Sequence, residues 1–299
     1  MKTVLMGAVS SSRVVLERMV ATHFPLSLVL SLDTGNSPHA SGFVPLHEVA
    51  RQHGVPFQTF VKANSPEVVQ TLRDIAPDYL FVIGLSQLIR KEILDIPSKG
   101  VVGFHPTPLP KFRGRAAMVW QVLLGVRETK CSLFLIDEGM DSGPILGQEP
   151  YVIGENDYAR DVQIKLHAAL ARLTDRVLAQ MLDGTLHPVP QNDEEATILL
   201  VRRPEDGHID WSRPLADVHR LVRAVSRPYP GAFGLYDGTH PVTIWRADIL
   251  ENHRFIGIPG QIARLGDGFF DVLGVDGLLR VTDFSNPDAV TLRVGHKLK

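Results

Sequence analysis

The sequence of 299 residues contains a single cysteine, Cys131. One cysteine excludes an internal disulfide framework and every cysteine-rich zinc site. It is typical of proteins in a reducing compartment, so we expect a cytoplasmic protein. No apolar run approaches the roughly 18 residues that a membrane-spanning helix needs, and the first residues, MKTVLMGAVSSS, lack the long apolar core of a signal peptide. We therefore expect no membrane partner.

An excess of either charge is also absent, because 31 lysines and arginines face 33 acidic residues, a net charge of -2. Such a chain has no general attraction to nucleic acid, so a polyanionic partner would need a local basic patch. Residues 31–50 contain no lysine or arginine at all. These two observations favour a small-molecule partner over a nucleic-acid partner.

Several catalytic motifs are missing as well. The chain has no Walker loop, no nucleophile elbow and no zinc-protease helix motif, and we predict no metal site. The segment GAVSSSRVV at 7–15 has one glycine where a dinucleotide fingerprint has three. A nicotinamide-dependent dehydrogenase is therefore the weaker of the enzyme alternatives.

Short β-branched runs alternate with amphipathic stretches through the first half of the chain. Strands are expected at 3–8, 26–30, 79–83, 100–104 and 132–136, and helices at 13–21, 46–53, 116–124 and 157–182. A further helix should begin after Ser65, which suits an N-cap, with Pro66 in its first turn. This alternation predicts an α/β fold with a Rossmann-like, doubly wound, mostly parallel sheet.

The character of the sequence changes after Gly184. Residues 185–201 are polar and contain prolines, which is typical of a linker. From residue 202 onward one expected helix, near 215–225, is followed by short strands separated by turn sequences such as YPGAF and GDGFFDV. We therefore predict a catalytic domain over 1–184, a linker over 185–201, and a second, smaller C-terminal β-barrel-like (OB-type) domain over 202–299.

The most informative stretch, GFHPTPLPKFRGRAAMVW at 103–120, contains no acidic residue. Three prolines at alternate positions follow His105, and because proline fixes φ and removes a backbone donor, they predict a stiff loop. His105 would then lie where a buried strand ends, which is where open α/β sheets bind their ligands.

An acidic loop offers a partner for this histidine. Asp137, Glu138 and Asp141 follow the strand expected at 132–136. A carboxylate beside an imidazole would raise its pKa and hold its tautomer, so that the pair could move a proton and donate to an oxyanion. Ordinary solvated loop acids are the alternative interpretation.

Two further groups could contact a ligand. Arg113 and Arg115, on either side of Gly114, could bind a phosphate or carboxylate, or could pair with acids of the protein itself. Ser10 and Ser11 could present hydroxyls at a helix N-terminus to a ligand, or could cap that helix.

These residues resemble a known family. The stretches GFHPTPLPKFRGRAAMVWQVLLG and SLFLIDEGMDSGPILGQ resemble the folate-dependent formyltransferases, which share Asn-x-His, Leu-Pro, Arg-Gly and Asp-x-Gly-x-Asp-[Ser/Thr]-Gly. The separation of His105 from Asp141 is also the family's. RRPEDGHIDW and RAVSRPYPGAFGLYDG resemble the entry to the C-terminal domain of methionyl-tRNA and sugar formyltransferases.

The resemblance implies an enzyme that moves the formyl group of 10-formyltetrahydrofolate to an amine. His105 would donate to the oxyanion, and Asp141 would orient His105 and accept the proton of the amine. The resemblance also implies that the pterin binds, mostly through main-chain groups, along two segments. These are Leu85, Ser86, Gln87 and Leu88 in the first, and Asp137, Glu138 and Gly139 in the second.

One position departs from the family pattern, because the family asparagine two residues before the histidine is Gly103. Losing an oxyanion donor can cost about 3 kcal/mol. The chain could use another donor, could be a slower enzyme, or could be a catalytically silent folate- or sugar-binding homologue. Some members of the family that this chain resembles, associated with surface-sugar pathways, carry the same Gly-Phe-His-Pro variant, and this resemblance favours the first explanation. We expect Gly103→Asn to keep or raise the activity.

The class of the acceptor amine is inferred from the family resemblance together with the lack of basic residues in 31–50. Enzymes acting on initiator tRNA carry a basic insertion where residues 31–50 have no basic residue. The RGRA sequence at 113–116 resembles enzymes that formylate nucleotide-linked amino sugars, which implies Arg113 or Arg115 near the diphosphate and Ser10 and Ser11 near the sugar. Methionyl-tRNA and a hydroxyornithine-type amine are the alternative acceptors, and a homodimer is left open.

Overall fold

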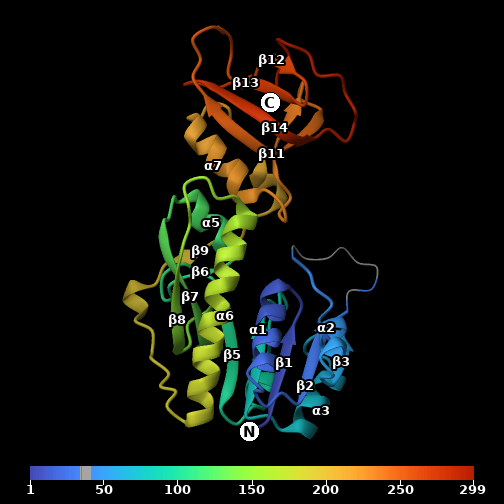
Figure 1. Ribbon diagram of the computed structural model, residues 1–299, viewed down its shortest axis with the longest axis vertical. Helices are drawn as coiled ribbons and strands as arrows, with labels where there is room; N and C mark the ends of the chain where they lie inside the picture. Colours follow the sequence, from blue (N-terminus) through green and yellow to red (C-terminus); the bar gives the residue numbers. More distant parts are fainter. Residues whose placement is uncertain (34, 36–41) are drawn as a thin grey trace. The chain divides into compact units, whose positions relative to one another are not determined.

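The computed structural model describes residues 1–33, 35 and 42–299. The chain divides into two compact units, each of which is described by itself (Figure 1). The first unit comprises residues 1–117, 128–152 and 164–199, and the second comprises residues 118–127, 153–163 and 200–299. The domain boundaries predicted at residues 184 and 202 stay a prediction.

A seven-stranded sheet forms the centre of the first unit, in the order β3-β2-β1-β4-β5-β7-β8. The parallel strands are β1 (Thr3–Gly7), β2 (Leu28–Leu32), β3 (Phe57–Phe60), β4 (Tyr79–Ile83) and β5 (Gly100–His105). The strands β7 (Glu128–Leu135) and β8 (Ile145–Val152) are antiparallel. The predicted mostly parallel, Rossmann-like sheet is confirmed.

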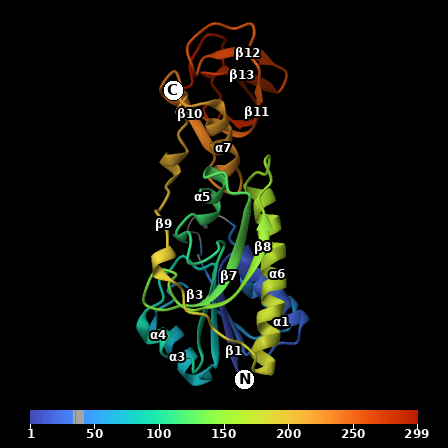
Figure 2. The same cartoon turned by 90° about the vertical axis from the view of Figure 1, so that its left-hand side faces the viewer.

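Helices cover both faces of this sheet (Figure 2). One side carries α1 (Ser10–Ala21) and the part of α6 (Ala159–Asp183) from Ile164 onward, which Arg18 and Asp175 join by an ion pair of 2.7 Å. The other side carries α3 (Pro66–Ile75) and α4 (Lys91–Leu94). Alternate residues of β1 explain this layering, because Val4 and Met6 pack into the same apolar core as α3.

The start of α3 agrees with its sequence. The Ser65 hydroxyl accepts the Val68 N–H at 3.5 Å, and Pro66 lies in the first turn. The short helix α2 (Leu46–Gln52) also belongs to the first unit, whereas α5 (Ala117–Leu123) lies in the second unit from residue 118 onward. None of the helices in the described residues is long and apolar enough to cross a bilayer.

The second unit contains an antiparallel five-stranded sheet with the helix α7 (Leu215–Val225) beside it. Its order is β10 (Ala232–Tyr236), β11 (His240–Leu250), β14 (Leu278–Ser285), β13 (Phe269–Leu273) and β12 (Ile262–Gly266). The last residues join the two edges of this sheet, because Lys299 donates to Leu235 and Leu298 donates to Gly260, each at 2.8 Å. The sheet therefore closes into the barrel-like domain that the sequence predicts.

Candidate active site

His105 is the last residue of β5 and is only 6% exposed. The ring is therefore buried at the end of the strand. Its Nε2 atom lies 2.7 Å from the Phe112 carbonyl oxygen. Since a carbonyl can only accept, Nε2 must carry the proton of a neutral ring, and the Nδ1 lone pair is left free for chemistry.

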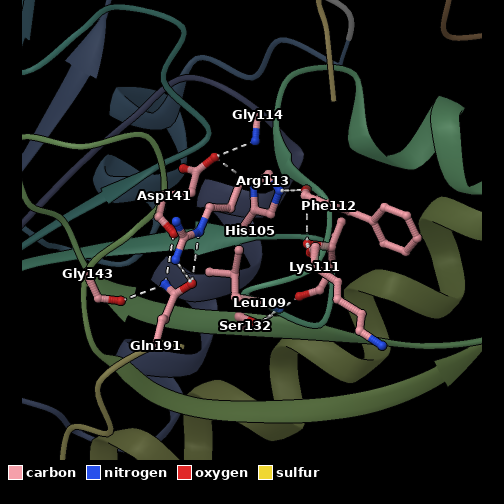
Figure 3. A network of polar contacts seen from close by, with 11 residues as sticks. His105, Leu109, Lys111, Phe112, Arg113, Gly114, Ser132, Asp141, Gly143 and Gln191 are labelled. Carbon is pink, nitrogen blue, oxygen red and sulfur yellow. Dashed lines mark hydrogen bonds and ion pairs between the residues drawn. The ribbon is translucent and has the colours of Figure 1, made fainter. Parts of the chain in front are cut away.

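Asp141 faces that second nitrogen (Figure 3). Its Oδ2 atom lies 3.6 Å from His105 Nδ1 and accepts the Gly114 N–H at 2.8 Å. A separation of 3.6 Å permits an ion pair but is too long for a direct hydrogen bond. The structure thus brings together the acid and the imidazole that the sequence singles out, and the catalytic role of each stays a prediction.

The route by which Asp141 reaches His105 differs from the one expected. The two side chains were expected to project from two strand ends at one sheet edge, but β7 is antiparallel to β5. The Ile136 N–H donates to the Val101 carbonyl at 2.7 Å, so the acidic loop leaves near the start of β5. It then turns back toward His105, with Asp141 itself at a φ of 50°.

Burial controls the protonation of the histidine. Desolvation lowers the pKa of His105 below its usual value, although the negative charge of Asp141 and the Phe112 carbonyl both favour the protonated ring. The imidazole is therefore neutral near pH 7, with a lone pair on Nδ1 that faces a carboxylate. Such a pair can take a proton from a substrate and hold it as an imidazolium that the acid stabilises.

Arg113 lies inside the protein rather than on its surface, and it is 7% exposed. Its guanidinium donates to Gln191 Oε1 from Nε at 3.1 Å and from Nη2 at 2.9 Å, and it pairs with Asp193 at 2.7 Å. Arg113 therefore takes the second of its two alternatives, pairing with groups of the protein itself. Arg115 is exposed and forms no ion pair with any residue in the described ranges, so it is the better candidate for a ligand phosphate.

Gln191 is a residue that sequence reasoning missed. Its Nε2 atom donates to the carbonyls of Asp141 at 2.8 Å and Gly143 at 2.7 Å, while its Oε1 accepts from Arg113. Gln191 thus connects the arginine loop to the acidic loop and fixes the backbone on which Asp141 sits. Nothing in the sequence marks it, because it lies in a polar stretch that is typical of a linker.

Gln191→Ala should lower kcat about tenfold or more with little change in KM, because the variant loosens the loop of Asp141 without touching a substrate. It should also lower the free energy of unfolding by about 1–3 kcal/mol, since buried partners lose their hydrogen bonds. Steady-state kinetics and urea unfolding measure both effects. Gln70→Ala, which removes an exposed bond to Asp74, is the matched control, and equal behaviour of the two variants would contradict the positioning role.

Side chains hold the carbonyl groups of the proline loop between His105 and Arg113, and the stiffness of this loop stays a prediction. The bonds, written from donor to acceptor, are Tyr151 Oη to Pro106 at 2.8 Å, Ser132 Oγ to Thr107 at 2.7 Å, Gln148 Nε2 to Leu109 at 2.8 Å and Thr107 Oγ1 to Lys111 at 2.9 Å. These clamps fix the Phe112 carbonyl against His105 and with it the tautomer of the ring.

Gly103 lies in β5 on the same side of the strand as His105. Its φ lies outside the left-handed region, so the position needs no special backbone freedom. A Cβ atom there would instead lie 2.9 Å from the Phe134 ring and 2.8 Å from Ile136. Phe134 therefore fills the space that the family asparagine would need.

This crowding changes the expectation for Gly103→Asn. We now expect the variant to lose about 1–3 kcal/mol of unfolding free energy through overpacking. The loss should be smaller in a Phe134→Leu background, and urea unfolding of the four proteins in this double-mutant cycle measures the difference. The same loss in both backgrounds would mean that Phe134 does not restrict the position.

The first predicted folate segment follows β4. The Gln87 side chain accepts from Ala63 N–H at 2.7 Å and donates to Val61 at 2.8 Å, so it holds a neighbouring loop rather than a ligand. The Leu88 carbonyl accepts from Asn64 at 2.7 Å. In the part of the chain that the structure describes, the main-chain groups of Leu85 and Ser86 form no hydrogen bond, which suits recognition by the backbone.

The second predicted folate segment is internally ordered. Asp137 accepts from Gly139 N–H at 3.0 Å and from Ser142 Oγ at 2.8 Å. Glu138 pairs with Lys91 at 3.1 Å, and this pair joins the acidic loop to α4, which lies just beyond the first segment. The second segment is thus tied to the chain just after the first one.

The two serines lie in the first turn of α1. Ser11 is buried beside Gly84, where a Cβ would come within 2.8 Å of its Oγ, so Ser11 borders the first folate segment. The Ser10 hydroxyl lies 3.4 Å from His167 Nε2 of α6. The capping role falls instead to Ser12, whose Oγ accepts from Ala8 and Val9. A contact of Ser10 or Ser11 with a sugar stays a prediction.

Comparisons with known proteins identify the class. The formyl transferase family model matches residues 39–178, and the model of the formyl transferase C-terminal domain matches residues 202–294. The chain belongs to the formyltransferase family. A methionyl-tRNA formyltransferase of Caldanaerobacter subterraneus subsp. tengcongensis is 34% identical over 226 residues, which cover 75% of this chain and 72% of that protein.

Two solved structures share the fold at lower identity. An N-formyltransferase from Helicobacter canadensis, in complex with folinic acid and dTDP-3-aminofucose, is 18% identical, with a TM-score of 0.66 over 95% of this chain and 100% of that one. HypX from Aquifex aeolicus, in complex with tetrahydrofolic acid, is also 18% identical, with a TM-score of 0.71. That match covers 95% of this chain but only 44% of HypX, so this chain spans less than half of HypX.

Proposed function

We propose that the protein transfers the formyl group of 10-formyltetrahydrofolate to a primary amine, and that the acceptor is a nucleotide-linked amino-deoxysugar. The observation that carries the proposal is the pair of His105 and Asp141, with Nδ1 and Oδ2 3.6 Å apart, within a chain of the formyltransferase family. A buried neutral imidazole beside a carboxylate suits a reaction in which an amine must lose a proton as it attacks a carbonyl.

The chemistry assigned to this pair is a proton relay. As the amine nitrogen bonds to the formyl carbon, the carbonyl electrons move to the formyl oxygen, and the proton of the amine passes to the pair. The imidazolium that forms on His105 has an Nδ1–H with which to stabilise the negative oxygen, and Asp141 stabilises the imidazolium. When the bond from the formyl carbon to the folate nitrogen breaks, that nitrogen takes the proton from the pair.

The folate donor fits the loops beside the pair. The free main-chain groups of Leu85 and Ser86 are available to the hydrogen-bonding edge of a pterin. The segment from Asp137 to Gly139 is joined to the same region through the ion pair of Glu138 with Lys91. Two relatives that share the fold were solved with tetrahydrofolic acid and folinic acid, which supports a folate donor for this chain.

The proposal of a sugar acceptor is based on where the chain has basic residues and where it lacks them. Residues 31–50 contain no basic residue, which disfavours a nucleic-acid acceptor, although residues 34 and 36–41 of that segment lie outside the described residues. The exposed Arg115 is suited to a diphosphate. The Helicobacter canadensis relative was solved with an amino sugar carried on a nucleotide, which supports the same acceptor class.

Methionyl-tRNA is the second candidate acceptor, because the relative with 34% identity is a methionyl-tRNA formyltransferase. The test is to compare kcat/KM for nucleotide-linked amino sugars, formylatable methionyl-tRNA and hydroxyornithine with 10-formyltetrahydrofolate as donor. We expect the highest value for an amino sugar. A higher value for the tRNA would overturn the argument from the missing basic residues.

A further inference from the structure

A cavity of about 410 Å3 lies within the second unit. It is bordered by the chain at the end of α5, by residues 153–156, by α7 and by β11. Its volume lies in the range of roughly 300–1,000 Å3 that is usual for small-molecule sites. None of the residues assigned above to the formyl-transfer site lines it.

A buried arginine that forms no ion pair in the described part of the chain marks this cavity. Arg223 of α7 is 8% exposed, and its Nη1 donates to the Asp157 carbonyl at 3.0 Å. Its Nε is buried and has no hydrogen-bond partner in the described part of the chain, where Arg223 also forms no ion pair. Burying a charged group without a close ion-pair partner costs on the order of several kcal/mol of folding free energy, and proteins rarely keep such a group without a reason.

Two more arginines line the same cavity from other elements. Arg127 follows α5 and lies 3.5 Å from Glu155, and Arg220 of α7 lies 3.2 Å from Asp217. Both are more accessible than Arg223, with side chains 51% and 34% exposed. Burial lowers the pKa of Arg223, and the positive charges of Arg220 and Arg127 also lower it, whereas Tyr158 and Asp157 raise it.

The acids around the cavity form no close ion pair with Arg223. Glu155 and Asp248 line it, but both residues are exposed, and Glu155 contacts Arg127 only at 3.5 Å. One other titratable neighbour is His219, which stands edge-on to the Tyr158 ring. Another is Asp157, a half-buried acid whose charge favours the protonated form of Arg223. Within the described residues none of these acids forms an ion pair with Arg223, and Asp157 is the only one of the three acids that is partly buried.

We propose that this cavity binds the phosphate or diphosphate group of a small phosphorylated molecule, held by Arg127, Arg220 and Arg223. Planar guanidinium groups suit tetrahedral phosphate, because each can form two parallel hydrogen bonds to its oxygens. A bound anion would offset the repulsion among the three cations. The inference does not depend on the formyl-transfer proposal.

Titration calorimetry of the full chain with inorganic pyrophosphate, at constant ionic strength in potassium chloride, tests the proposal. We expect saturable binding to the natural chain and a loss of affinity of about tenfold or more in Arg127→Gln and Arg220→Gln, since each removes charge-assisted bonds. Both side chains are partly exposed, so these variants should fold, which circular dichroism checks.

Arg213→Gln is the matched control, because Arg213 also pairs with Asp217, at 2.8 Å, but does not line this cavity. It should keep the affinity of the natural chain. Absence of saturable binding, or an equal loss in all three variants, would overturn the proposal. Binding of a short RNA duplex through Arg127 and Arg220 without any binding of pyrophosphate would also overturn it, in favour of a nucleic-acid surface.

Discussion

Asp141→Asn is expected to lower kcat of formyl transfer by about 10²–10⁴-fold, the usual contribution of a general acid–base group, while the protein stays folded. Asparagine has nearly the shape of aspartate, and its carbonyl oxygen can still accept the Gly114 N–H that Asp141 accepts at 2.8 Å. It has no charge to stabilise an imidazolium and cannot share a proton with His105. The loss should therefore appear in kcat rather than in the affinity for the folate donor.

A second readout separates this role from a structural one. Because the charge of Asp141 favours the protonated ring, its removal should lower the pKa of His105 further, which NMR titration of the ring measures. Asp74→Asn, an exposed change on α3, should leave both the rate and that pKa unaltered. A normal rate in Asp141→Asn, or a higher pKa of His105, would contradict the assigned pair.

His105→Gln is expected to reduce kcat over a similar range, about 10²–10⁴-fold, because glutamine can donate to the Phe112 carbonyl but cannot accept and return a proton. The variant should also lose about 1–3 kcal/mol of unfolding free energy, since the ring is buried and hydrogen-bonded at 2.7 Å. Fixed-time activity assays measure the loss of kcat, and urea unfolding measures the loss of unfolding free energy.

The pH profile follows from the lowered pKa of His105. A neutral ring is needed to take the proton of the amine, so the rate should fall only when the pH drops through a value below the usual 6.5. The free energy of unfolding should change with pH in the same direction, because the unfolded chain binds a proton more readily than the buried ring does. This free energy therefore decreases as the pH falls below about 6.5. His105→Gln should reduce both dependences, whereas His53→Gln, at an exposed position, should reduce neither. A rate that increases below pH 6 would contradict a neutral base.

Regular elements with strong local signals were predictable from the sequence. The strand Tyr79–Ile83 and the helix Leu215–Val225 have their predicted bounds, because each is apolar in the period of its type. The strands β3 and β8 were missed, since FQTF is short and mostly exposed and ILGQEPYV is an edge strand containing Pro150. The antiparallel direction of β7 depends on long-range pairing, which no local pattern encodes.

Some residues of the candidate site could likewise be identified from the sequence, and others could not. His105 and Asp141 could be named from the sequence because a stiff proline loop and an acidic glycine-rich loop are visible there. Gln191 and Phe134 could not, because their importance comes from what they touch in space, namely the Asp141 loop and the room beside Gly103. Arg113 could be read in two ways until its partners were known, because an arginine in a loop suits a ligand and an internal acid equally well.

The measurement that tests the central claim most directly is the mass of the acceptor after a single turnover with 10-formyltetrahydrofolate and a nucleotide-linked amino sugar. The account predicts the gain of one formyl group with the natural chain, and no gain over the same time with Asp141→Asn. An unmodified acceptor with the natural chain, while folate binds, would indicate a folate-binding homologue that does not catalyse transfer to it. Equal formylation by both proteins would show that the reaction does not use the pair of His105 and Asp141.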